Sequence, residues 1–116
     1  MALPESDWQL FRSVHATALD RYCKRVLEEC AATIREPDMS AHERYLRLFR
    51  LLRARDQSIA AAFNDLRRST AVQRLAAMIL LELVTGEELD RFSEATRDTA
   101  TELADISRSS RKGKRR

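Results

Sequence analysis

The sequence predicts an all-α protein, namely a helical bundle built from a long antiparallel helical hairpin, a third apolar helix and one or two short C-terminal helices. Three observations predict this class. Between residues 38 and 112 the only glycine or proline is Gly86. The same stretch is rich in Ala, Leu, Arg and Glu, which are good helix formers. In addition, apolar side chains recur with helical spacing in two long segments.

The first predicted helix spans residues 7–35. Ser6 is the expected N-cap, because Gln9 follows three residues later, and Pro37 disfavours helical geometry at the preceding residue. At about 100° per residue, one arc of this helix collects the apolar residues and one histidine: Trp8, Phe11, His15, Ala18, Leu19, Tyr22, Val26 and Cys30. The segment is therefore a strongly amphipathic helix.

The second predicted helix spans residues 41–68. Ser40 and Glu43 fit a capping box, with serine at the N-cap and glutamate three residues on. One arc of this helix holds the large apolar side chains Tyr45, Leu48, Phe49, Leu52, Ile59, Phe63 and Leu66. Because the connection to the first helix is short, the two helices should be antiparallel neighbours.

A third helix should follow over residues 70–84, capped by Ser69 or Thr70 and apolar almost all round from Leu75 onward. Gly86 is expected to end it. Thr85 and Glu88 form a new capping box that opens a short helix through Phe92. A last helix, capped near Ser93, is expected to reach about Ile106.

Charge divides the chain into a body and a tail. The net charge is +3, but residues 107–116 contain six of the 21 basic residues and no acidic residue. The body, residues 1–106, therefore carries 15 basic against 18 acidic side chains. We expect one helical domain over residues 1–106 and a disordered basic tail over residues 107–116.

The sequence also predicts a cytoplasmic protein without a membrane segment. The N-terminus carries acidic residues where a signal peptide needs basic ones. The most apolar run, residues 75–84, is too short to cross a bilayer, which takes about 20 residues. Cys23 and Cys30 lie about two helical turns apart, too far for a disulfide bond. Reduced thiols are therefore expected.

Basic residues form two candidate contacts for anions or nucleic acid. Arg67, Arg68 and Arg74 flank the start of the third helix, where free backbone N–H groups favour an anion. The alternative is that these arginines complement the dipole at the end of the second helix. The tail offers a second contact through Arg111, Lys112, Lys114, Arg115 and Arg116, with a solubilising or protein-binding arm as the alternative.

His15 and Asp56 interrupt the apolar arcs of the first and second helices. In an antiparallel hairpin they would lie about one turn apart, so they are candidates for a buried imidazole–carboxylate pair. A structural pair or a histidine at a subunit boundary is the alternative. No serine or cysteine nucleophile accompanies them, and a metal would need more than two ligands. No catalytic, metal or cofactor site is therefore predicted.

The hairpin should be longer than a compact domain of this size, and a shorter third helix could cover only part of its apolar groove. We therefore expect a homodimer, with an interface that includes Met78, Ile79, Leu80, Leu81, Leu83 and Val84. The leading functional hypothesis is a non-enzymatic, homodimeric adaptor or regulator that binds another protein. The alternatives are a nucleic-acid-associated protein that uses the basic contacts and, third, an enzyme based on His15 and Asp56.

Overall fold

The computed structural model describes the backbone of residues 1–114 and the side chains of residues 1–111. Within these residues all regular structure is helical and no strand occurs, which confirms the predicted all-α class. A short 3₁₀ turn, Arg68–Thr70, joins the second and third helices. The five α-helices are α1 (Glu5–Ile34), α2 (Ala41–Phe63), α3 (Ala71–Leu80), α4 (Gly86–Asp90) and α5 (Glu94–Lys114).

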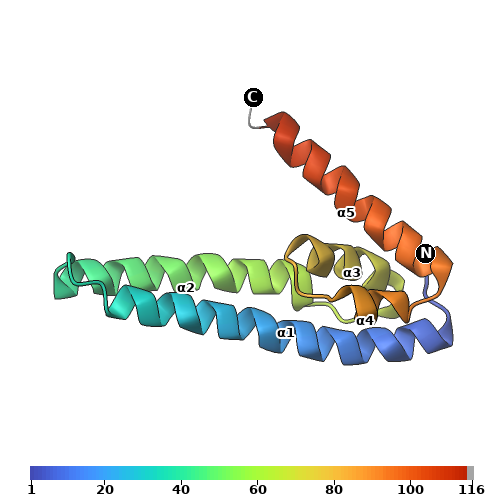
Figure 1. Cartoon of the computed structure of the whole chain (residues 1–116), viewed down its shortest axis with the longest axis horizontal. Coiled ribbons are helices and arrows are strands. Elements are labelled where there is room, and N and C mark those ends of the chain that lie inside the picture. Colours follow the sequence, from blue (N-terminus) through green and yellow to red (C-terminus); the bar gives the residue numbers. More distant parts are fainter. Residues whose placement is uncertain (115–116) are drawn as a thin grey trace.

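The long helices α1 and α2 lie side by side as an antiparallel hairpin, with the turn between them at one end of the molecule (Figure 1). The capping box at the start of α2 is confirmed, since the Glu43 backbone N–H donates to Ser40 Oγ at 3.1 Å. The start of α1 differs from the prediction. Pro4 occupies the N-cap position, and Gln9 donates to the Glu5 carboxylate at 2.8 Å. Proline before the first turn is favoured because it has no N–H to leave unpaired.

The connection between α2 and α3 begins earlier than predicted, because α2 ends at Phe63 rather than at Arg68. Asp65 has a left-handed backbone conformation, with φ at 66°, which turns the chain away from the helix. Thr70 does not cap α3, as its hydroxyl donates to the carbonyl oxygens of Asp65 and Arg67. Such local hydrogen bonds from threonine compete with helix formation.

The end of α3 is also earlier than predicted. Glu82 adopts the left-handed conformation, with φ at 57°, and the Leu83 N–H donates to the Met78 carbonyl at 3.0 Å. This is the hydrogen-bond pattern of a Schellman C-cap, in which glycine is the usual residue. Gly86 is therefore not the terminator of α3 but the first residue of α4. The predicted Thr85 capping box at the start of α4 is confirmed.

The main core lies at the end of the hairpin that is remote from its turn, where α3 packs against α1, α2 and α5. Its largest fully buried side chains include Phe11, Leu75, Met78 and Leu83. The opposite end of the molecule consists of α1 and α2 alone (Figure 1). The molecule is 52 Å long with a radius of gyration of 16.7 Å, against about 13 Å for a compact chain of this size. The predicted overshoot of the hairpin is thus present.

The burial of α3 corrects the predicted dimer interface. Met78 and Leu83 have no exposed surface within the single chain, so they belong to its core. Ile79, Leu80, Leu81 and Val84 are half-buried. Met78 and Leu83 join the main core cluster, while α5 packs on α3 through a face of small residues, Thr96, Ala100 and Ala104, all fully buried. Small side chains let the two helices approach closely, although they contribute little to an apolar pattern in the sequence.

The last helix is longer than predicted. Its backbone remains helical through Lys114, where a disordered tail was expected from residue 107. No glycine or proline interrupts the segment before Gly113. In addition, Arg108 donates to Asp105 one turn earlier at 3.2 Å, an arrangement that supports helix on an exposed face. Residues 115–116 lie outside the described part of the chain.

Candidate interaction surface

The predicted pair of His15 and Asp56 does not form. His15 Nε2 lies 2.9 Å from the Phe63 carbonyl oxygen, and its ring meets the Phe63 ring edge-on at 5.3 Å. Asp56 is exposed on α2. A different pair joins the two helices. Arg55 of α2 donates to both carboxylate oxygens of Glu29 of α1, at 3.0 and 2.8 Å. These hydrogen bonds lower the pKa of Glu29.

The arginines predicted to hold an anion are engaged within the chain. Arg67 pairs with Asp65, and this contact lowers the pKa of the Asp65 carboxyl. Arg68 donates to the Leu3 carbonyl at 2.7 Å and to Glu5 at 2.8 Å. Arg74 donates to the carbonyl of Ala61. An anion at this site would have to displace these partners.

Of the basic tail residues predicted to contact nucleic acid, the structure describes only the side chain of Arg111. The Arg111 side chain is exposed and borders a shallow hollow with residues of α2 and α3. The side chains of Lys112 and Lys114, and the whole of Arg115 and Arg116, lie outside the described residues. The predicted nucleic-acid contact through the tail therefore stays a prediction.

The rotation of α2 about its axis leaves much of its apolar arc uncovered. Leu48, Leu51 and Ile59 are half-buried and pack against the core. By contrast, three large side chains from the same arc face solvent: Tyr45 is 66% exposed, Phe49 52% and Leu52 47%. Because they recur every three or four residues, they form one stripe along α2.

Helix α1 extends this stripe sideways. Ile34 is 54% exposed and Leu27 is 65% exposed, and they lie about two turns apart on the same side of α1. Ile34, Tyr45 and Leu48 line one shallow hollow of about 280 Å³, so the exposed apolar residues of α1 and α2 share a face. We call this the distal face, and it consists of Leu27, Ile34, Tyr45, Leu48, Phe49 and Leu52.

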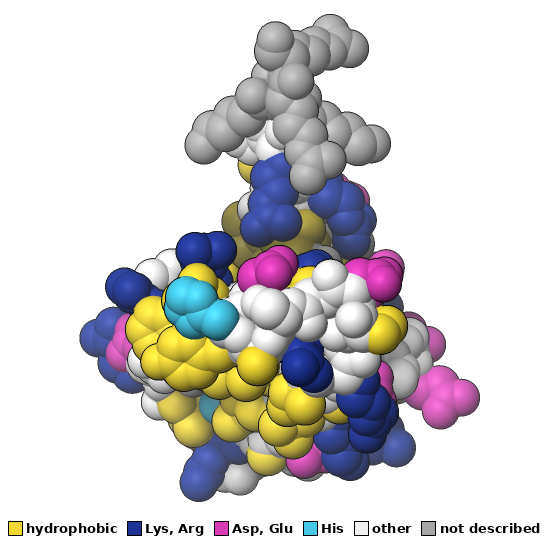
Figure 2. All heavy atoms as spheres, turned by 90° about the vertical axis from the view of Figure 1, so that its left-hand side faces the viewer, with side chains coloured by type: hydrophobic (Ala, Val, Ile, Leu, Met, Phe, Trp, Pro, Cys, Tyr) yellow, Lys and Arg dark blue, Asp and Glu magenta, His cyan; other side chains and the backbone are white. Residues whose placement is uncertain are grey.

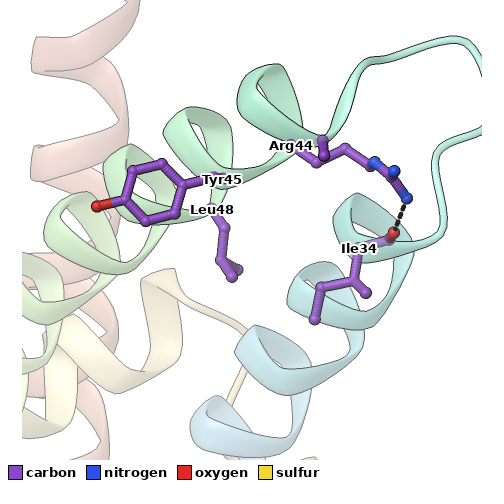
Figure 3. A pocket seen from close by; sticks show the side chains of 5 residues that line it. Ile34, Arg44, Tyr45 and Leu48 are labelled. Atoms are coloured by element: carbon purple, nitrogen blue, oxygen red, sulfur yellow. Dashed lines mark hydrogen bonds between the residues drawn. The ribbon is translucent and has the colours of Figure 1, made fainter.

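Figure 3 shows how the two helices meet in this hollow. Arg44 of α2 reaches across the helix pair and donates to the backbone carbonyl of Ile34 at 2.8 Å. Leu48 points between the helices, whereas the Tyr45 ring points away from Ile34 (Figure 3). A second hollow, of about 390 Å³, continues along α2 and is lined by Phe49, Leu52, Arg53 and Asp56.

Charged residues border the distal face, and the two edges differ. On the α2 edge the Arg53 guanidinium lies 5.7 Å from the centre of the Phe49 ring, and Arg50 is exposed beside it. On the α1 edge the charges are mixed, with exposed Glu28 and a Lys24–Asp20 pair at 2.8 Å. Figure 2, which looks at the turn end of the hairpin, shows apolar side chains gathered there with both basic and acidic side chains around them.

A buried polar cluster near the N-terminus was missed by sequence reasoning. Asp7 is 3% exposed and accepts hydrogen bonds from the Ser93 backbone N–H at 3.0 Å and from Thr96 Oγ1 at 2.6 Å, besides the Ser93 hydroxyl. The sequence places Asp7 one turn before buried Phe11, which was the available signal. Its carboxylate caps α5 from a distant helix, so the cluster joins two parts of the fold.

In the part of the chain that the structure describes, no three or more His, Cys, Asp or Glu side chains lie close enough together to hold a metal ion. Every helix in the same part of the chain is too short or too polar to cross a bilayer. Comparisons with family models, curated proteins and solved structures find no significant match. The distal face is therefore the candidate functional site of the described residues.

Proposed function

We propose that this protein is a non-enzymatic helical interaction module and that the distal face is its binding surface. The observation that supports the proposal is the exposure of five large apolar side chains, between 47 and 66%, on one face of the hairpin. Contiguous exposed apolar patches of this kind mark interaction sites more often than scattered apolar residues do.

Covering the distal face offers a substantial driving force. Full burial of a large apolar side chain contributes about 1.5–3 kcal/mol. Because five such side chains are about half exposed, a partner that covered them would gain on the order of 5 kcal/mol from this term. That gain is comparable to the lower end of the stability of a domain, about 5–15 kcal/mol.

The alternatives receive less support from the described residues. An enzyme based on His15 and Asp56 lacks its pair, since His15 contacts a backbone carbonyl and Asp56 faces solvent. The nucleic-acid hypothesis lacks free guanidinium groups around α3, because Arg67 and Arg68 pair with carboxylates. We also propose a cytoplasmic location, supported by the two free cysteines.

The proposal is tested by site-specific photo-crosslinking in the native cell. A photoreactive phenylalanine analogue replaces Phe49 in one variant and Ala54 in a matched control. Ala54 is exposed on the same helix but points to a different side. We expect a discrete crosslinked adduct from position 49 that is absent from position 54. Equal labelling at both positions, or none at either, would contradict the proposed binding surface.

A further inference from the structure

We infer that the distal face binds a second copy of this chain about a two-fold axis that runs along the hairpin, so that α1 of each copy packs beside α2 of the other. The result is a four-helix bundle made from two hairpins. The inference rests on the proposed function, because it names the occupant of the same surface. It also moves the dimer interface from α3, where the sequence predicted it, to the hairpin.

The width of the face favours a second hairpin over a single peptide helix. Exposed apolar side chains come from both helices, with Leu27 and Ile34 on α1 and Tyr45, Phe49 and Leu52 on α2. A single docked helix would fill the groove between α1 and α2, but it would leave the outer side chains of the distal face partly exposed to solvent. A two-helix layer buries its apolar face most fully against another two-helix layer, and a second copy supplies one of matching length.

The segment after α3 leaves room for this partner. The Arg25 guanidinium donates to the Leu81 carbonyl at 2.6 Å and also contacts the Glu82 carbonyl, which fixes the end of α3 beside α1. Arg25 and Leu27 are two residues apart in a helix, so they point to nearly opposite sides. The segment after α3 therefore lies behind the distal face rather than in front of it.

The apolar area agrees with a modest but specific interface. An aromatic side chain buries about 150–250 Å² in full. Two of the five half-exposed side chains are aromatic and three are smaller aliphatic ones, so together they offer on the order of 400–500 Å² of surface per copy. Two copies then bury roughly 1,000 Å² before the charged edges are counted, and a specific interface needs about that much. The charged edges of the distal face would add further buried area and bring the interface into the range of specific protein–protein interfaces.

Two hairpins can pair face to face about a two-fold axis that runs along the hairpin or about one that crosses it. Charge favours the first arrangement. If the two-fold axis crossed the hairpin, α2 would lie on α2 of the other copy, and the two sets of Arg50 and Arg53 would meet. Like charges in contact destabilise an interface. With the axis along the hairpin, Arg50 and Arg53 instead approach the α1 edge of the other copy, where the charges are mixed, with exposed Glu28 and Arg35 on the same side of the helix. Because Arg55 pairs with Glu29 within one chain, Arg53 and Glu28 lie at similar heights along the hairpin.

The first test is sedimentation equilibrium of the purified full chain at micromolar concentration. We expect twice the chain mass of 13.4 kDa, a fall to the single-chain mass for Phe49→Asp, and no change for the control Ala54→Asp. Circular dichroism of both variants checks that they remain helical, as expected for substitutions at exposed positions. A wild-type chain that is monomeric at every concentration would overturn the inference. If crosslinking at position 49 then captured a different protein, the proposed function would still stand.

The second test addresses the pairing of the helices through disulfide trapping. The background carries Cys23→Ser and Cys30→Ala and is first shown to remain helical and dimeric. An Ile34→Cys chain and a Leu52→Cys chain, distinguished by a tag, are mixed and mildly oxidised. In the register set by the Arg55–Glu29 pair, these two positions lie within about two residues of the same height along the hairpin, which a disulfide can bridge. We expect the mixed disulfide between the two chains to dominate, because α1 of one copy faces α2 of the other. A dominant Leu52→Cys homodimer would instead show α2 facing α2 and would overturn the inferred arrangement.

Discussion

Arg21 on α1 and Glu88 on α4 form a two-pronged ion pair, with Nη1 2.6 Å from Oε1 and Nη2 3.1 Å from Oε2. The same Arg21 Nη1 donates to the Leu83 carbonyl at 2.8 Å, and Glu88 also accepts the Thr85 backbone N–H at 2.9 Å. The Arg21 hydrogen bonds are the main reason why the pKa of Glu88 falls to about 2 from its usual 4.5. This contact ties the segment between α3 and α4 to the hairpin.

The ion pair predicts a loss of stability in acid. Because the pKa of Glu88 is lower in the folded chain than in the unfolded one, its contribution is fully present above pH 4.5 and is lost as the pH falls toward 2. We expect Glu88→Gln to lower the free energy of unfolding at pH 7 by about 1–2 kcal/mol, after allowance for solvent screening. Urea denaturation at pH 7, 4 and 2.5 measures the free energy of unfolding of both proteins. The difference between wild type and Glu88→Gln should become smaller as the pH falls. The exposed neighbour Glu87→Gln is the control, and an equal loss for Glu88→Gln at all three pH values would contradict the explanation.

The buried carboxylate of Asp7 predicts a loss of stability when its charge is removed. Burial alone would raise its pKa, but hydrogen bonds from Ser93 and Thr96 outweigh burial and leave the pKa below its usual 3.8. Asp7→Asn places an amide N–H₂ among these donors, so we expect the free energy of unfolding to fall by about 2 kcal/mol. Chemical denaturation at pH 7 measures the change. Asp98→Asn, on the exposed side of α5, should cost less than about 0.5 kcal/mol, and equal losses for both variants would rule out a special role for Asp7.

The left-handed residue that ends α3 predicts a stabilising substitution. Glu82 has φ at 57° with an exposed side chain, and its backbone groups make the hydrogen bonds of the C-cap. Glu82→Gly relieves the strain of that conformation, so we expect the free energy of unfolding to rise by about 1 kcal/mol. Glu102→Gly in the middle of α5 is the matched control and should lower it by about 1 kcal/mol. Thermal and urea unfolding both report these changes, and a loss of stability for Glu82→Gly would refute the C-cap assignment.

Local sequence determined the helices and several of their ends. Ser40 with Glu43, and Thr85 with Glu88, form capping boxes because the hydroxyl and carboxylate need only reach backbone N–H groups within one turn. The single short connection at Pro37 likewise made α1 and α2 antiparallel neighbours. These features depend on residues a few positions apart, so the sequence predicts them without knowledge of the fold.

Tertiary structure decided how each helix is rotated and what covers it. Helical periodicity placed Tyr45, Phe49 and Leu52 on one arc, but it could not say that α2 would turn Leu48, Leu51 and Ile59 toward the core and leave that arc facing solvent. It also gave no sign that the small residues Thr96, Ala100 and Ala104 of α5 would be buried where α5 packs on α3. An apolar arc defines a surface that prefers to be covered, whereas the neighbour that covers it depends on contacts between segments far apart in the chain. The distal face is therefore encoded in the sequence as an apolar stripe, and it is exposed because the folded chain leaves that stripe uncovered.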